Sequence, residues 1–119
     1  MNSVYMLIDE KREYALVKIG FASCIKNRMI TYATSNPEAM CVDYVHTQSR
    51  SKHYVEKQFH KEILEKGYMF IRSNIFGSKT EWFKIGYDDP FYMELKLKGL
   101  NAFNCGKNRK TYGRFKIEA

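Results

Sequence analysis

The stretch from Ser3 to Phe21, SVYMLIDEKREYALVKIGF, decides the fold. Two apolar runs, Ser3–Asp9 and Ala15–Phe21, flank the charged turn Glu10–Glu13. Short apolar runs that end at turn residues are typical of buried strands. We therefore predict two strands joined as a hairpin, with Gly20 near the end of the second strand.

The region after the hairpin predicts a helix and then a third strand. Ser23 is a favourable helix N-cap, and the helix is expected to run to Ala33, because the residue before Pro37 avoids helical geometry. Cys41–Thr47 alternates between apolar and polar residues, as a strand does. Two sets of side chains are expected to share a face: Ile25, Met29, Tyr32 and Ala33 on the inner side of the helix, and Val42, Tyr44 and His46 on the strand.

The strongest helical periodicity lies in Lys52–Lys66. Its apolar residues Val55, Phe59 and Ile63 recur every four positions, and Gly67 supplies a C-terminal stop. The remaining predicted elements are a short strand over Tyr68–Arg72, a strand over Glu81–Ile85 that closes the sheet, and a short helix over Pro90–Lys98.

A chain of 119 residues with 45% hydrophobic residues fits one domain that needs no disulfides. The order of the elements indicates the α+β class, with a small mixed sheet flanked by helices. We expect the folded domain to span residues 1–100 and a basic tail or hairpin to span residues 101–119. The basic residues of this tail, which are expected to contact nucleic acid, are Lys107, Arg109, Lys110, Arg114 and Lys116.

The formal net charge of +7 favours a polyanionic partner, because Lys and Arg on phosphates release counterions. A mildly basic protein with another role has the same composition, so charge leaves both interpretations open. Three cysteines without a CxxC pair indicate a reducing compartment. No apolar run reaches the ~20 residues of a membrane span, and the start of the chain does not resemble a signal peptide. We expect a cytoplasmic protein.

Two charged residues lie at the edges of predicted apolar helix faces. Counting about 100° per residue places Glu56 at the border of the face that holds Ile63. Such a carboxylate is either a metal ligand or one half of a boundary ion pair with Lys52 or Lys57. Arg28 borders the apolar stripe one turn before Tyr32. Its guanidinium either binds a phosphate or lies over the edge of the core.

The histidines His46, His53 and His60 are seven residues apart, but they fall on a strand, a helix start and a helix. Their spacing therefore predicts no common site, and no zinc-binding spacing occurs. His60 follows Glu56 by one turn, so it is either an auxiliary residue of the same site or a structural histidine. The sequence has no Walker loop, GxGxxG, GxSxG or HExxH motif, which excludes those enzyme classes.

The chain contains an ordered set of short motifs: Val4-Tyr5-Met6, Val17-Lys18-Ile19-Gly20, Arg28 with Tyr32, Thr34-Ser35-Asn36-Pro37, Val55-Glu56, Phe59-His60 and Glu81-Trp82-Phe83. This set resembles the GIY-YIG nuclease superfamily. The resemblance is greatest to its branch of small phage and bacterial proteins named after a coliphage open reading frame and a meiotically up-regulated gene. In the second motif Lys18 stands where the superfamily has tyrosine, as is common in this branch, and the first motif lacks its glycine.

The resemblance implies a three-stranded antiparallel sheet with helices around it, and hydrolysis of DNA phosphodiesters with one Mg²⁺ or Mn²⁺. Glu56 would hold the metal, and Arg28 would hold the scissile phosphate. Tyr5 would position or deprotonate the attacking water, assisted by Tyr32. Lys18 would bind a phosphate, or act as a base if burial lowers its pKa.

The sequence therefore predicts a divalent-metal-dependent DNA endonuclease in the cytoplasm of a bacterium or a phage-infected host. A homodimer is one way for it to cut both strands, because one centre cuts one strand. Two alternatives stay open. One is a non-catalytic DNA-binding module on the same fold, which Lys18 and the basic tail favour. The other is a phage-type protein that binds and inhibits a host factor.

Overall fold

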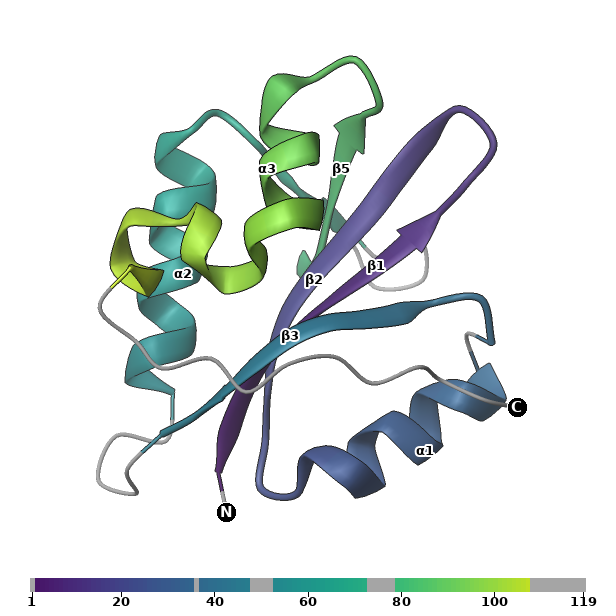
Figure 1. Cartoon of the computed structure of the whole chain (residues 1–119), viewed down its shortest axis with the longest axis vertical. Coiled ribbons are helices and arrows are strands. Elements are labelled where there is room, and N and C mark those ends of the chain that lie inside the picture. Colours follow the sequence, from purple (N-terminus) through teal and green to yellow (C-terminus); the bar gives the residue numbers. More distant parts are fainter. Residues whose placement is uncertain (1, 36, 48–52, 73–78, 108–119) are drawn as a thin grey trace.

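The computed structural model describes residues 2–35, 37–47, 53–72 and 79–107, and it is built on a five-stranded antiparallel sheet (Figure 1). The α+β class is confirmed. The expectation of a three-stranded sheet is wrong, and so is that of a mixed sheet, because two further strands extend the hairpin's free edge and every pairing is antiparallel. The strand order is β3-β1-β2-β5-β4, with β1 at Ser3–Glu10, β2 at Tyr14–Ala22, β3 at Met40–His46, β4 at Phe70–Arg72 and β5 at Lys79–Gly86.

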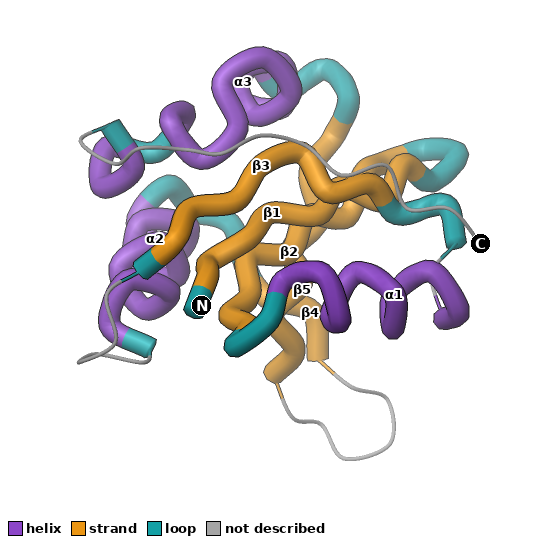
Figure 2. The backbone as a smooth tube through the Cα atoms, turned by 60° about the horizontal axis from the view of Figure 1, so that its bottom comes forward, coloured by secondary structure: helices purple, strands orange, loops and turns teal. Residues whose placement is uncertain are grey.

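The strand β1 is buried on both faces, which explains its continuous apolar run. Successive side chains point to opposite faces, so Met6 and Ile8 enter one core and Tyr5 and Leu7 enter the other. Helices cover both faces of the sheet (Figure 2). The helix α1 (Ile25–Ser35) covers the Tyr5 face, and α2 (Tyr54–Glu65) and α3 (Pro90–Lys98) cover the other.

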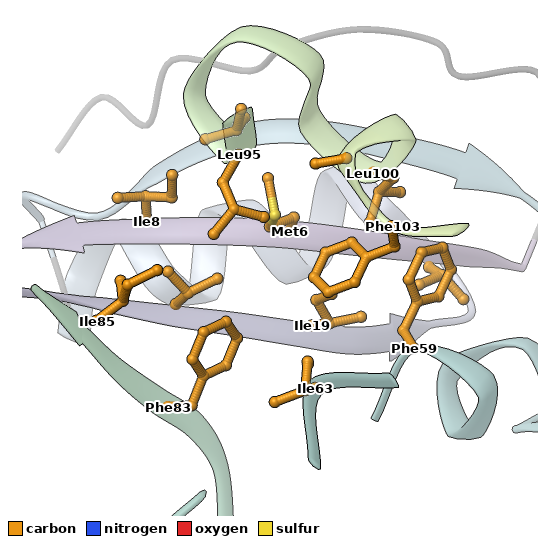
Figure 3. Packing of buried hydrophobic residues seen from close by; sticks show 14 of the residues in the cluster. Met6, Ile8, Ile19, Phe59, Ile63, Phe83, Ile85, Leu95, Leu100 and Phe103 are labelled. Carbon is orange, nitrogen blue, oxygen red and sulfur yellow. The ribbon is translucent and has the colours of Figure 1, made fainter. Parts of the chain in front are cut away.

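The larger core lies between the sheet and the helices α2 and α3 (Figure 3). Phe59 of α2 packs edge-on against Phe103, with ring centroids 5.4 Å apart. Phe103 follows the 3₁₀ turn Gly99–Ala102 and precedes a second turn, Asn104–Gly106. The packed part of the chain therefore continues past residue 100, although the division into residues 1–100 and 101–119 stays a prediction.

Two buried carboxylates tie these 3₁₀ turns to the rest of the fold. Glu62 of α2 accepts hydrogen bonds from the backbone N–H groups of Asn104 and Cys105, at 2.8 and 3.0 Å. Asp43 of β3 accepts one from Leu100 N–H at 2.9 Å. Lys107 is the last described residue and is exposed. The other predicted tail contacts, Arg109, Lys110, Arg114 and Lys116, lie outside the described residues.

The strand β3 differs from the sequence prediction in the facing of its side chains. Val42 packs in the larger core, whereas Tyr44 packs against the smaller one, so the two do not share a face. The cause is a register shift between Met6 and Leu7, which pair with Asp43 and Cys41. One extra residue in β3 reverses the alternation, as a β-bulge does.

The helices within the described ranges are all shorter or more polar than a membrane-crossing helix.

Candidate active site

Two tyrosines and a lysine meet on the α1 face of the sheet. Tyr5 of β1 and Lys18 of β2 lie on adjacent strands, because Tyr5 pairs with Gly20 and Lys18 is two positions earlier on the same face. The Lys18 ammonium donates a hydrogen bond to the hydroxyl of Tyr32 from α1. The Tyr32 hydroxyl lies 3.4 Å from that of Tyr5. An ammonium only donates, so the Tyr32 oxygen accepts from Lys18 and its own proton can be shared with Tyr5.

Gly20 makes room for the Tyr5 hydroxyl. A Cβ atom at this position would lie 2.5 Å from Tyr5 Oη and 3.2 Å from Lys18 Cε. These separations are shorter than van der Waals contact, so only glycine fits without displacing the tyrosine. The glycine of the Lys18-Ile19-Gly20 motif therefore has a packing function at the site.

Glu81 of β5 connects the lysine to the second helix. Its carboxylate lies 3.5 Å from Lys18 Nζ, and its negative charge contributes to the raised pKa of Glu56. Glu81 directly precedes Trp82, the residue that pairs with Lys18 across β2 and β5. The ring of Trp82 also contacts the lysine, with its centroid 5.8 Å from Lys18 Nζ. Sequence analysis matched Glu81 to a family motif but assigned it no contact in the site.

Glu56 lies in the first turn of α2 with only 7% of its surface exposed. Burial, together with the charge of Glu81 and the hydrogen bond with Glu81, raises the pKa of its carboxyl group to about 7. The positive charges of Lys18 and Lys57 act in the opposite direction on this pKa. A second carboxylate beside a buried first one favours a shared proton or a cation between them.

Two histidines flank this carboxylate. His53 Nδ1 lies 4.0 Å from one Glu56 oxygen and His60 Nδ1 lies 3.9 Å from the other. The prediction that the three histidines lie apart is wrong for these two, because they precede Glu56 by three residues and follow it by four, which places them on neighbouring turns. It is correct for His46, which hydrogen-bonds with Ser3 at 2.8 Å.

Arg28 is exposed on α1 and lines a polar hollow of about 250 Å³. Its positive charge opposes the rise in the pKa of Tyr5, which is raised mainly by burial and by the hydrogen bond with Tyr32. Arg28 is therefore close enough to act electrostatically on Tyr5 while its side chain is exposed. The hollow is lined by Ala22, Ser23, Cys24, Asn27, Arg28 and Thr31.

The donor set around Glu56 fits a divalent cation that keeps part of its water. Within the described ranges, no group of three or more His, Cys, Asp and Glu side chains is arranged as a closed metal site. Mg²⁺ commonly takes one or two carboxylates and completes its shell with water and phosphate oxygens. Glu56, together with a second carboxylate, Glu81, close enough to raise its pKa, has this chemistry.

A family model for the T5orf172 domain matches residues 2–90. The chain belongs to the T5orf172 domain family. These are nuclease-like, DNA-related domains of phage and bacterial proteins. No curated protein and no solved structure matches the chain.

The T5orf172 match covers the five strands and the first two helices in full, and it contains every side chain that meets at the site. It ends at Pro90, where α3 begins, so the two 3₁₀ turns follow the matched region. The network of Tyr5, Lys18, Tyr32, Glu81 and Glu56 is thus built from the T5orf172 domain alone.

Proposed function

We propose that this T5orf172 domain is a divalent-metal-dependent endonuclease of the GIY-YIG superfamily that hydrolyses DNA phosphodiesters. One observation carries the proposal: a carboxylate, an amine and two phenols form a chain of contacts that acts on a buried glutamate. The contacts run from Glu81 through Lys18 and Tyr32 to Tyr5, and the charge of Glu81 helps to raise the pKa of Glu56. Phosphodiester hydrolysis needs this combination of metal ligand, cation and water-positioning groups.

We assign the binding of the scissile phosphate to Arg28. Its guanidinium is always charged and can donate two parallel hydrogen bonds to non-bridging oxygens. Its exposure beside a polar hollow leaves access for a DNA backbone. As negative charge grows on the phosphate oxygens in the transition state, Arg28 stabilises it.

The metal is assigned to Glu56, with the Glu81 carboxylate close by. When bound, Mg²⁺ or Mn²⁺ would supply the Lewis acid that the phosphodiester oxygens require. Glu56 itself provides a fixed oxygen donor, because α2 and its packing hold it at the core edge.

The water-positioning role is assigned to the phenol pair. Burial and the bond to Tyr32 raise the pKa of Tyr5, so Tyr5 keeps its proton at neutral pH and cannot serve as the base. Tyr32 is half-buried and therefore reaches solvent more readily. In this proposal the Tyr32 oxygen accepts a hydrogen bond from the attacking water and so positions it, while the Lys18 ammonium and the Tyr5 hydroxyl hold Tyr32 in place.

The test is cleavage of supercoiled plasmid by the purified protein. Nicking is expected with Mg²⁺ or Mn²⁺ and not with EDTA. Arg28→Ala should lower the rate by about 10²-fold, whereas Lys26→Ala, an exposed cation on another side of α1, should leave it unchanged. A folded protein that binds DNA but does not cut it with either metal would refute the proposal and favour the non-catalytic binding module.

A further inference from the structure

His60 makes two contacts with different parts of the site. Its Nε2 lies 2.7 Å from the backbone carbonyl oxygen of Ile19, and its Nδ1 lies 3.9 Å from Glu56 Oε1. The ring also packs edge-on against Phe70, with centroids 5.0 Å apart. Its side chain is only 17% exposed, so these contacts fix both the position and the plane of the imidazole.

The contact with Ile19 determines the tautomer of a neutral His60. A carbonyl oxygen only accepts hydrogen bonds, so the proton must be on Nε2. Nδ1 then carries the lone pair, and Nδ1 is the ring nitrogen that lies 3.9 Å from Glu56 Oε1. Histidines that bind metals in proteins share this arrangement, because they donate their other ring N–H to a carbonyl or carboxylate.

From this geometry we propose that His60 Nδ1 is a second protein ligand of the divalent cation held by Glu56. The inference rests on the proposed function, which assigns the metal to Glu56. Two atoms that bind one cation at about 2.1 Å each lie no more than ~4.2 Å apart. The Nδ1–Oε1 separation of 3.9 Å is within this limit, and the spacing of four residues on one helix keeps both donors on one side of α2.

His53 is the natural comparison within the same site. Its Nδ1 lies 4.0 Å from Glu56 Oε2, but its side chain is 58% exposed. It packs at a tilted angle against Phe21, with ring centroids 4.9 Å apart. The contact that fixes the ring of His60, a carbonyl at hydrogen-bond distance, is absent from the described contacts of His53. His60 is therefore the ligand, and His53 provides a matched control.

A nitrogen ligand has a consequence for metal choice. Mg²⁺ favours oxygen donors, whereas imidazole binding becomes stronger along the first transition series. A site made from Glu56 and His60 should therefore bind Mn²⁺, and Co²⁺ more strongly still, in preference to Mg²⁺. This preference would distinguish the chain from a nuclease that holds its cation by a single carboxylate.

The test is pulsed electron paramagnetic resonance on the full chain loaded with Mn²⁺. Coupling of the Mn²⁺ electron spin to a directly bound ¹⁴N is expected in the wild type, and it should change to a ¹⁵N pattern when the histidines are ¹⁵N-labelled. The coupling should be lost in His60→Gln and retained in His53→Gln. His60→Gln should also weaken Mn²⁺ binding about tenfold or more, while Mg²⁺ binding changes much less.

The wild-type spectrum decides the proposal without relying on a variant that has to fold. Bound Mn²⁺ without nitrogen coupling would overturn the role of His60, and so would coupling lost in His53→Gln but kept in His60→Gln. If DNA cleavage depends on Glu56 but no nitrogen coupling appears, only the inference about His60 fails. If coupling appears and the loaded protein never cuts DNA, the proposed function fails and the metal site stands.

Discussion

Gly20 lies under the Tyr5 hydroxyl, and its missing side chain is what lets the phenol pair form. Gly20→Ala should displace Tyr5 and lower the free energy of unfolding by about 1–3 kcal/mol, because a methyl group would be forced into filled space. Gly86, at the end of β5, has no atom within 4 Å of the place that a methyl group would take, so Gly86→Ala is the matched control and should be nearly neutral. Urea denaturation of the wild type and the two variants measures these changes in the free energy of unfolding. Equal stabilities would contradict the packing argument.

Glu56 should destabilise the metal-free protein at neutral pH. Its folded pKa of about 7 exceeds the ordinary 4.5, so the folded state binds the proton more tightly than the unfolded state does. The loss of folding stability is absent below pH 4.5. It grows as the pH rises from 4.5 to about 7, and it is fully present above pH 7. In EDTA at pH 8, Glu56→Gln should be more stable than the wild type by on the order of 1–3 kcal/mol.

Thermal unfolding at pH 4 and pH 8 measures this effect. The difference between Glu56→Gln and the wild type should be large at pH 8 and close to zero at pH 4. A Gln variant that is less stable than the wild type at pH 8 would show that the ionised carboxylate is well compensated without a metal.

The two helices of the site differ in how well sequence predicts their contacts. The periodicity of α2 predicts the burial of Val55, Phe59 and Ile63, and all three are buried. It also places Glu56 at the core edge. It cannot identify Glu81 as the partner, because that contact depends on the pairing of β2 with β5, which joins residues far apart in the chain.

The strand β3 shows a second limit of the same kind. Its alternation predicts a strand, and Met40–His46 forms one. The facing of Val42 and Tyr44 was predicted wrongly, because one bulged residue reverses the pattern without leaving a signal in the composition. Local periodicity predicts which segments become elements, whereas register is set by the neighbouring strand.

The helix α2 also anchors the 3₁₀ turns through Glu62. Glu62→Ala removes the acceptor of two backbone N–H groups, those of Asn104 and Cys105, and should lower the free energy of unfolding by about 1–3 kcal/mol. Glu65→Ala, three residues further along α2 with 62% of its side chain exposed, should be neutral. Chemical denaturation measures the free energy of unfolding of both variants. Equal stability of the two variants would show that the turns need no anchor on α2.

The described part of the chain ends at Lys107, and most of the predicted basic tail follows it in the sequence. Ending the chain after residue 99 would remove Leu100 and Phe103 from the core and should abolish a stable fold. Ending it after residue 107 should keep the fold. It should weaken DNA binding and flatten its salt dependence, because residues 108–119 hold four Lys or Arg against one Glu.

Fluorescence anisotropy with a labelled duplex at several salt concentrations tests this prediction. The slope of the logarithm of the DNA-binding constant against the logarithm of the salt concentration should become less steep by up to about 3. An unchanged slope in a folded variant that ends at Lys107 would assign DNA binding to residues 1–107 and remove the basic tail from the account.

The most direct test of the central claim compares supercoiled plasmid cleavage by the wild type, Glu56→Gln and Glu65→Gln in Mn²⁺ or Mg²⁺. Both substitutions remove one carboxylate from α2, but only one of them lies in the network with Glu81 and Lys18. We expect nicking by the wild type and by Glu65→Gln, and none by Glu56→Gln, which should still bind DNA. Undiminished nicking by Glu56→Gln, or none by any of the three folded proteins, would contradict this claim.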